Sequence, residues 1–349
     1  MRRDNVLKDY FRAKYPLISG SYDIYALFVA ITLQLVKHNG SYSYIIPNKF
    51  LVAKYSQKLL NKLLQDRSLQ SAINLARFNI FEAASVYPII ISGELKSSSG
   101  FDRYEVTSID DFIRGSFVRE SPLKAYSTIK DAGLKVMSGL AGFQASSVIN
   151  SIHSADGAGR IPFTVSGCID RYVISNRNVR YMNSRYSSAY IDIDCGMSRS
   201  KVSFWTKPKV VIAGMTRVIE AVFVDQPYAL GVGIYGIQCE SNRQAQVVAA
   251  ILNSKFISFY FTRMFRDKML AGGYLAINKN TIEEIPYIAP ADDIMDEIYE
   301  LSARIHAAKE VDQTADTSPM ETRVDQLVNS IFGLGPDEIE EIDSWSAGE

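Results

Sequence analysis

The sequence predicts an α/β unit that is followed by an α+β unit and a helical tail. Two observations predict the first unit: a β-rich run, Ser41 to Ile46, follows a helix-like segment at residues 22–36, and a second helical segment at 49–65 comes next. Strands that alternate with helices are typical of α/β folds. The third observation concerns the chain after residue 122, where strand-like runs lie between Gly- and Ser-rich loops and one long helical segment, 243–265, comes late. That pattern favours an α+β unit.

The elements of the first unit are predicted in order. Six residues of the 22–36 segment recur at helical spacing and are expected to face the core: Tyr25, Phe28, Val29, Thr32, Leu35 and Val36. Pro47 ends the 41–46 strand, and the 49–65 helix has leucines near one face. Two further strands are expected near 69–75 and 86–92, and the second lacks polar alternation, which indicates burial on both faces.

A polar break at 96–100 is followed by residues of weak periodicity, so we expect a linker there. The predicted organisation is a first unit at 1–98, a linker at 99–121, a second unit at 122–287 and an acidic tail at 288–349. In the second unit, strands are expected at 163–165, 171–175, 209–213, 218–224 and 233–238. Two amphipathic helices around a polar spacer, 311–319, are expected in the tail.

The composition narrows the class of protein. With 349 residues, 47% hydrophobic and 22% charged, the chain is long enough for two domains and is neither disordered nor fibrous. Three cysteines without a CxxC pair and three scattered histidines form no disulfide framework and no zinc-site spacing. The longest uncharged stretch, 24–36, is too short to cross a bilayer. We therefore expect a cytoplasmic protein without a membrane partner or a metal.

The net charge is zero, but acidic and basic residues are distributed unequally along the chain. Residues 292–349 contain 16 acidic and 3 basic residues, a net −13, so the rest carries 35 basic and 22 acidic residues, a net +13. Such a basic body favours a polyanionic partner, and the alternative is a solvated surface balanced by the tail. Between 171 and 217, nine Lys and Arg lie among aromatic residues with only Asp192 and Asp194. This mixture suits nucleic acid, because cations neutralise phosphates and Arg reads guanine edges.

Motifs of self-contained catalysis do not occur in the sequence. It has no GxxxxGK[ST], no GxGxxG after a strand, no HExxH and no GxSxG. Asp192, Asp194 and Cys195 have a spacing that suits a metal, but a solvated strand edge explains it more simply. We expect no catalytic residue in this chain.

Several segments resemble one enzyme family in the family's order. SGSYDIYALFVAITLQLVKHNGSYSYIIPNKFLVAKYSQKLL and INLARFNIFEAASVYPIII resemble the second half of the catalytic domain of gamma-class adenine-specific DNA methyltransferases. PFTVSGCIDRYVIS, PKVVIAGMTRVIEAVF and VVAAILNSKFISFYFTRMFR resemble the TaqI-like C-terminal specificity domain. The end, VDQLVNSIFGLGPDEIEEID, is similar to that of type IIG restriction-modification enzymes. The resemblance implies the C-terminal half of a Rossmann-like methyltransferase sheet, a TaqI-like target recognition domain and an acidic helical tail.

Segments on which the family's chemistry depends do not occur in this sequence. The family binds S-adenosylmethionine through a Gly-containing turn and an acidic residue, and it holds the target amine with an Asn-Pro-Pro-Tyr segment. In the seven-stranded sheet that the resemblance implies, 41–46 is the fifth strand and has no neighbour on one edge. We therefore expect a separate partner chain that carries the N-terminal methyltransferase half, and cofactor use only when that half is supplied.

The resemblance also implies roles for single residues. Phe81 matches the aromatic that stacks on the flipped target adenine. Phe28 matches a position that lines the adenosine end of the cofactor pocket. Thr216 and Arg217 match a turn that faces DNA. Four further residues are expected to contact the DNA backbone: Arg199, Lys201, Lys209 and Arg263.

The predicted function is the target-recognition subunit of a split adenine-specific DNA methyltransferase, in restriction-modification or phage defence, acting on double-stranded DNA. The alternative is a non-catalytic, sequence-specific DNA-binding module derived from such an enzyme. An RNA-binding protein is a weaker third interpretation, because no RNA-module motif is present.

Overall fold

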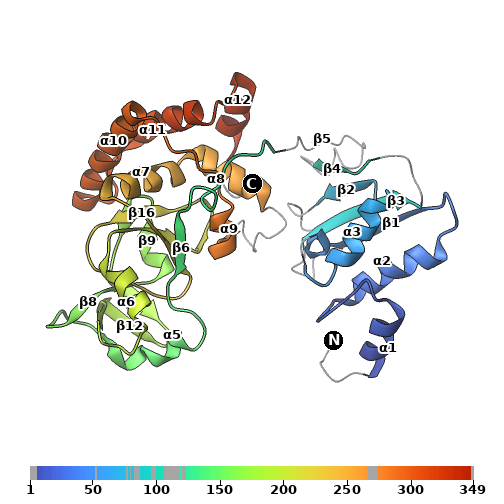
Figure 1. The fold of residues 1–349 in the computed structure, drawn as a ribbon, viewed down its shortest axis with the longest axis horizontal. Helices are drawn as coiled ribbons and strands as arrows, with labels where there is room; N and C mark the ends of the chain where they lie inside the picture. Colours follow the sequence, from blue (N-terminus) through green and yellow to red (C-terminus); the bar gives the residue numbers. More distant parts are fainter. Residues whose placement is uncertain are drawn as a thin grey trace. The chain divides into compact units, whose positions relative to one another are not determined.

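The computed structural model describes residues 6–51, 53–75, 78, 80–81, 87–95, 100–105, 118–119, 123–265 and 274–346. The chain divides into two compact units, unit 1 at 1–122 and unit 2 at 123–349 (Figure 1). Both units mix helices and strands, so the predicted fold class is confirmed.

Unit 1 is built on one five-stranded sheet in the order β1-β3-β2-β4-β5. Its strands are β1 (Ser41–Pro47), β2 (Ser71–Asn74), β3 (Pro88–Glu94), β4 (Asp102–Glu105) and β5 (Val118–Arg119). Strand β3 is antiparallel to both β1 and β2, whereas β4 is parallel to β2. The helices are α1 (Val6–Lys14), α2 (Ile24–Leu35) and α3 (Gln57–Gln65), and a 3-10 helix, η1 (Asn48–Leu51), follows β1.

The sheet of unit 1 differs from the prediction in two places. The expected linker, 99–121, contributes β4 and β5, because strands of four and two residues are too short to show a periodic pattern. Residues 99, 106–117 and 120–121 of that linker lie outside the described residues. In β3, Ile89 and Ile91 are buried but Ile90 is only half-buried, so the strand is not fully covered on both faces. Gly93 of this strand is required by packing, because a Cβ there would lie 1.9 Å from the carbonyl oxygen of Ser68.

Unit 2 contains two four-stranded sheets, ordered β16-β14-β18-β6 and β17-β8-β13-β7. The strands of the first are β6 (Lys135–Ser138), β14 (Lys209–Ala213), β16 (Ala221–Val224) and β18 (Ile234–Gln238). Those of the second are β7 (Ile152–His153), β8 (Arg160–Thr164), β13 (Tyr190–Asp192) and β17 (Ala229–Leu230). Three two-stranded pairs complete the unit: β9 (Ile169–Asp170) with β10 (Val173–Ile174), β11 (Arg177–Tyr181) with β12 (Ser184–Ser188), and β15 (Met215–Thr216) with β19 (Leu275–Ala276).

Strand β14 lies between two hydrophobic cores. All five of its residues are buried. Val210 and Ile212 pack into a core shared with the long helices, and Val211 and Ala213 pack into a second core shared with the β17-β8-β13-β7 sheet. Because successive side chains of a strand point to opposite faces, this one strand joins the two halves of unit 2.

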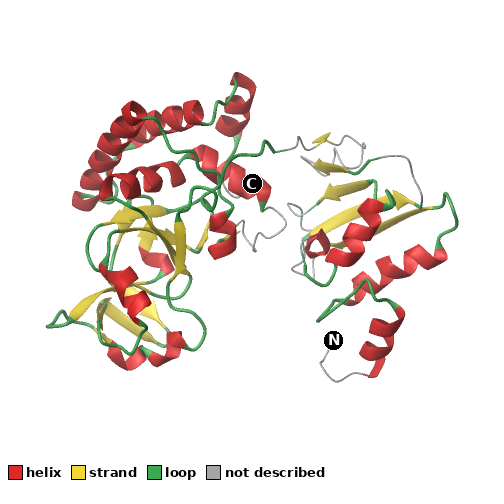
Figure 2. Cartoon of the chain, viewed as in Figure 1, coloured by secondary structure: helices red, strands yellow, loops and turns green. Residues whose placement is uncertain are grey.

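Helices cover the first sheet of unit 2. Helix α7 packs on β14 and β16, and α10 and α11 pack against α7 (Figures 1 and 2). The helices of this unit are α5 (Gln144–Ser147), α6 (Arg199–Thr206), α7 (Asn242–Leu252), α8 (Lys255–Met264), α9 (Lys279–Glu283), α10 (Asp292–Val311), α11 (Ser318–Ile331) and α12 (Pro336–Ser344), with 3-10 turns η2 (Ile149–Ser151) and η3 (Ser166–Cys168).

Two helical predictions for unit 2 are wrong in detail. The single helix expected at 243–265 is broken into α7 and α8, because the Asn253 side chain hydrogen bonds to both the N–H and the carbonyl of Ala221, at 2.8 Å each. The acidic tail has three helices rather than two, because the chain turns at Gly333, whose φ is +59°, and restarts at Pro336. Pro at the first helical position is favoured because its missing N–H would have no partner there.

The acidic tail is docked on the basic body through ion pairs as well as apolar contacts. Val324, Val328 and Ile342 of the tail lie in the core shared with α7 and α8. Arg171 pairs with Glu321 at 2.7 Å, and Arg263 pairs with Glu341 at 2.7 Å. Part of the positive charge of the body is therefore neutralised within the chain.

Lys209, which was predicted to contact DNA, lies in the core of unit 2. Its side chain is fully buried, and its ammonium donates to the carbonyls of Trp205 at 2.8 Å, Lys207 at 3.0 Å and Gln226 at 3.4 Å. Burial lowers the pKa of Lys209 to about 7, and the charge of Asp225 opposes that shift. The predicted contact between Lys209 and DNA is wrong, because its amine closes the end of helix α6.

We predict that Lys209→Met destabilises unit 2 by about 1–3 kcal/mol, because buried carbonyls lose their donor while the volume of the side chain is kept. Lys207→Met, at an exposed neighbouring position, is the matched control and should leave stability unchanged. Urea denaturation of both variants measures the difference. Equal stability of the Lys209 variant and the wild type would contradict the structural role.

A second prediction concerns Glu220. Burial is the main cause that raises the pKa of its carboxyl to about 7; the nearby charge of Asp170 raises the pKa further, and the charge of Arg171 lowers it. Because the folded pKa lies above the unfolded value, the folded state loses stability as pH rises from the unfolded pKa to about 7. We expect Glu220→Gln to raise the melting temperature by about 2–4 °C at about pH 8, after allowance for solvent screening. The gain should shrink as pH falls below about 7 and disappear at about pH 4, below the unfolded pKa. Thermal unfolding at both pH values tests this, and a pH-independent gain would contradict it.

Candidate nucleic-acid interface

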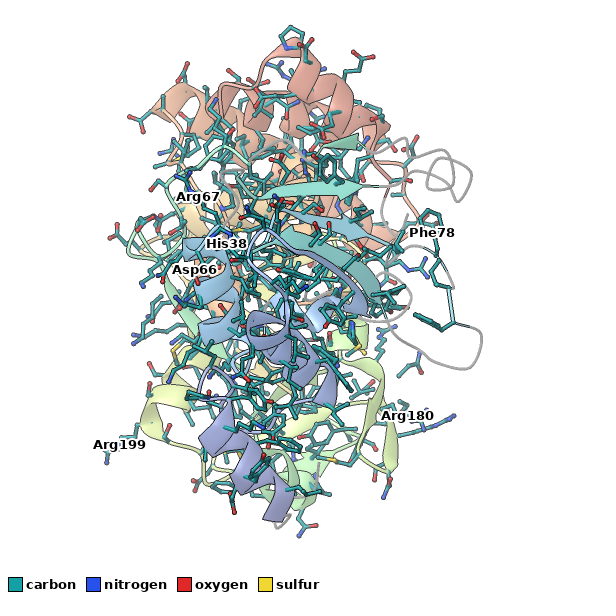
Figure 3. The ribbon with its side chains drawn as sticks, turned by 90° about the vertical axis from the view of Figure 1, so that its right-hand side faces the viewer. His38, Asp66, Arg67, Phe78, Arg180 and Arg199 are labelled. Atoms are coloured by element: carbon teal, nitrogen blue, oxygen red, sulfur yellow. The ribbon has the colours of Figure 1, made fainter. Side chains whose placement is uncertain are left out.

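The loop after β2 carries the aromatic that was predicted to stack on a flipped base. Phe81 is 41% exposed, whereas Phe78 of the same loop is half-buried. The described part of the loop begins with a turn, in which the Phe78 N–H donates to the Leu75 carbonyl at 3.0 Å and the Ile80 N–H donates to the Phe78 carbonyl at 2.9 Å. Figure 3 shows Phe78 projecting from this loop. An exposed ring beyond the end of a strand is available for stacking, and the role of Phe81 stays a prediction.

Helix α2 exposes an apolar stripe. Ile24, Phe28 and Leu35 are 59%, 56% and 75% exposed, while Leu27 and Val29 are buried. The predicted core face is therefore wrong for Phe28 and Leu35, because the helix packs through the face that contains the smaller residues. Thr32 and Tyr44 fix the helix to β1 through a hydroxyl–hydroxyl contact of 2.6 Å.

Strand β1 forms one margin of the unit 1 sheet. In the part of the chain that the structure describes, β1 pairs only with β3. Ile45 on this strand is an exposed aliphatic residue. A strand with an unpaired edge and exposed apolar side chains is a template for pairing with another segment.

The predicted DNA contacts of unit 2 have different environments. Arg199 and Arg217 are exposed, and the Arg217 guanidinium lies 5.5 Å from the centre of the Tyr274 ring. The Lys201 ammonium donates to the carbonyls of Ser138 at 2.7 Å and Gly139 at 2.6 Å, and burial lowers the pKa of its amine. Lys201 therefore ties α6 to β6 and does not present its charge to DNA.

Two further residues that were predicted to contact DNA make interactions within the chain. Thr216 is buried, and its hydroxyl donates to the carbonyl of Val218. Arg263 pairs with Glu341 of α12 and lies over the Phe259 ring at 5.4 Å. The burial of Thr216 leaves its side chain no exposed surface for DNA, whereas the contact of Arg263, whose guanidinium is paired with a tail carboxylate, stays a prediction.

The hairpin of β11 and β12 was not predicted, although its arginines belong to the basic stretch at 171–217. Arg177, Arg180 and Arg185 are exposed on it. Its signal in the sequence is the alternation of RNVRY, in which Val179 and Tyr181 are buried and Arg180 is exposed. A five-residue run rich in Arg and Asn is not typical of a strand, so the pattern was missed.

The structure also places the acidic pair that was considered for a metal. The Asp192 carboxylate contacts His153 at 2.8 Å and Arg160 at 3.2 Å, and the hydrogen bond from His153 is the main reason that the pKa of Asp192 is lowered. Over the described residues, no three His, Cys, Asp or Glu side chains are grouped in a way that would hold a metal ion. Nor does any helix in those residues have the length and apolarity to cross a membrane.

A cofactor of the predicted family, S-adenosylmethionine, fits the residues of this chain only in part. Phe28 offers an exposed ring that suits an adenosine. The Gly-containing turn and the acidic residue that would hold the rest of the molecule do not occur in the sequence. The chain on its own therefore does not supply a complete cofactor pocket.

Comparison with known proteins finds a family match within each unit. Residues 1–81 match the Eco57I restriction-modification methylase family, and residues 169–287 match the TaqI-like C-terminal specificity domain. The type II restriction enzyme and methyltransferase RM.Eco57I of Escherichia coli is 24% identical over 126 residues, which are 36% of this chain and 12% of that protein.

Two solved structures of restriction-modification enzymes are similar to this chain. The type IIL restriction-modification enzyme MmeI, solved in complex with DNA, has a TM-score of 0.51 and 13% identity over 96% of this chain and 55% of its own. The type IIG restriction endonuclease BpuSI has a TM-score of 0.40 and 13% identity over 95% of this chain and 53% of its own. The chain spans about half the length of these two proteins and an eighth of RM.Eco57I. The predicted family resemblance is confirmed: residues 1–81 are similar to the Eco57I restriction-modification methylase family, and residues 169–287 are similar to the TaqI-like C-terminal specificity domain.

Proposed function

We propose that this chain is the target-recognition part of an adenine-specific DNA methyltransferase in a restriction-modification or phage-defence system. The observation that carries the proposal is the order of the two matches, methylase region first and specificity domain second, in one chain. The methylase family implies S-adenosylmethionine as the methyl donor. Specificity domains of this kind act on DNA, so double-stranded DNA is the proposed substrate.

The proposed role of unit 1 is to hold the target base outside the duplex. A methyltransferase cannot reach an adenine amine inside the base stack, so the nucleotide must be extruded, at a cost of a few kcal/mol. The exposed ring of Phe81 supports the proposal, because stacking on an aromatic side chain offsets part of that cost. Arg199 and Arg217 are exposed and remain proposed DNA contacts.

We further propose that a partner chain supplies the cofactor-binding half and the Asn-Pro-Pro-Tyr segment. Two features of unit 1 support this: β1 has a free edge among the described residues, and α2 presents Ile24, Phe28 and Leu35 to solvent. Phe28 lies within that stripe, so a pocket completed by the partner would place adenosine against its ring. Covering these residues would remove an apolar face that otherwise favours aggregation.

The stacking role predicts that Phe81→Ala lowers kcat/KM for methyl transfer by roughly 5- to 150-fold, because a base stacked on an aromatic ring is worth about 1–3 kcal/mol. Phe81→Tyr should retain most activity, because it keeps a ring. Labelled S-adenosylmethionine and mixed-sequence duplex DNA, with this chain and its partner together, provide the assay. A loss in Phe78→Ala but not in Phe81→Ala would contradict the assignment.

If the partner covers this stripe, the double variant Ile24→Gln and Leu35→Gln should weaken association with the partner roughly 30-fold, because burial of each apolar side chain contributes about 1 kcal/mol to binding. Val311→Gln, at an exposed aliphatic residue of α10, is the matched control and should have no effect. The partner to test is the product of an adjacent gene that encodes the Gly-containing turn and the Asn-Pro-Pro-Tyr segment. Calorimetric titration measures the affinity.

The same assays distinguish the split methyltransferase from the alternative, a non-catalytic DNA-binding module. Methyl transfer by this chain without the partner would contradict the split-enzyme proposal. Salt-sensitive DNA binding without methyl transfer, in the presence of the partner, would favour a non-catalytic DNA-binding module.

A further inference from the structure

The hairpin of β11 and β12 in unit 2 exposes positive charge that the fold does not use. Val179 and Tyr181 are buried in the core of the β17-β8-β13-β7 sheet, whereas Arg180 and Arg185 are exposed. Within the part of the chain that the structure describes, neither guanidinium has a carboxylate partner. Other arginines of unit 2, such as Arg171 and Arg263, are paired with tail carboxylates.

The two arginines oppose each other across the hairpin. Arg180 and Arg185 are direct partners in the antiparallel register. Like charges directly opposite each other in such a pair destabilise the sheet. An anion that lies over the pair would relieve this repulsion.

The hairpin is held firmly, so its charges are presented at a fixed place. The Tyr181 hydroxyl donates to the Ala145 carbonyl at 2.9 Å, and its ring packs edge-on against Phe163 at 5.0 Å. At the start of the hairpin, the Arg177 N–H donates to the Ser175 hydroxyl at 3.0 Å. Side chains on a rigid ribbon lose less conformational entropy on binding than those on a mobile loop.

A hollow of about 540 Å³ lies beside the hairpin. Asn178, Arg180 and Met182 line it on the hairpin side, and Ser166 and Cys168 of η3 line it on the other. Figure 3 shows Arg180 projecting outward, on the side of unit 2 opposite Arg199. The concave surface leaves room for a bulky ligand next to the arginine pair.

We propose that the β11–β12 hairpin enters a groove of duplex DNA and that Arg180 and Arg185 bind its phosphodiester backbone. A two-stranded ribbon fits the major groove of B-DNA, and arginines neutralise phosphates. This inference rests on the proposed DNA recognition and adds the element that performs it. Neither arginine was among the contacts expected from the family resemblance.

The first test measures binding of the full chain to short mixed-sequence duplexes between about 50 and 200 mM salt. For the double variant Arg180→Gln and Arg185→Gln, we expect affinity to fall at least tenfold at the higher salt. The slope of log K against log salt should become shallower by about 1.8, which is about 0.9 for each lost phosphate contact. Arg304→Gln, at an exposed arginine of α10, is the matched control and should bind as the wild type does.

The second test separates recognition from folding. Arg180→Glu replaces the repulsion with an attractive cross-strand pair, so its melting temperature should equal or exceed that of the wild type while DNA binding is lost. A melting temperature that falls together with affinity would overturn the inference, because the arginines would then be structural. Wild-type affinity in the double variant would overturn it too, and would leave the proposed function standing. If the wild type itself binds no duplex DNA, the proposed function fails first.

Discussion

The structure of unit 2 depends on the two-sided burial of strand β14. Its alternating residues Val210 and Ile212 face the helices, and Val211 and Ala213 face the second sheet. A strand that serves two cores accepts no polar side chain on either face, unless all polar atoms are satisfied. Lys209 meets that condition, since its ammonium donates to two carbonyls at the end of α6 and to the carbonyl of Gln226.

This arrangement divides the charged surfaces of the domain. The core on one side of β14 is covered by α7, α8 and the acidic tail, and tail carboxylates neutralise Arg171, Arg243 and Arg263. On the other side of β14, the core supports the β11–β12 hairpin, whose arginines are unpaired among the described residues. The charge difference between body and tail therefore overstates the positive charge that DNA would meet, and the surface available for DNA lies away from the tail.

Much of the fold could be predicted from the sequence, because the elements involved have strong local patterns. At least half of the residues in the runs at 41–46, 209–213 and 233–238 are β-branched or aromatic, and each run forms a strand in the structure. The break at Asn253 could not be predicted, since it depends on a hydrogen bond to Ala221 in a strand 32 residues earlier. Nor could the burial of Lys209 and Thr216 be predicted, because a basic or hydroxyl residue in a DNA-binding context suggests exposure.

Only part of the candidate site was predicted from the sequence, because the rest depends on strand register. The exposure of Phe81 and Phe28 agrees with roles at a surface, but it tests neither role. The arginine pair on the hairpin depends on strand register, which brings Arg180 opposite Arg185, and a single sequence does not display that register. Charge counting in the sequence included both arginines in the basic stretch at 171–217 but could not show that they lie opposite each other on one hairpin.

The most direct test of the account is to crosslink the chain to mixed-sequence duplex DNA by ultraviolet light and to map the crosslinked peptides by mass spectrometry. We expect crosslinks in the peptide that contains residues 177–188 and none in the tail peptides at 292–344. Crosslinks confined to the tail, or their complete absence under conditions in which a known DNA-binding protein crosslinks, would contradict the claim that unit 2 recognises DNA through the face opposite the tail.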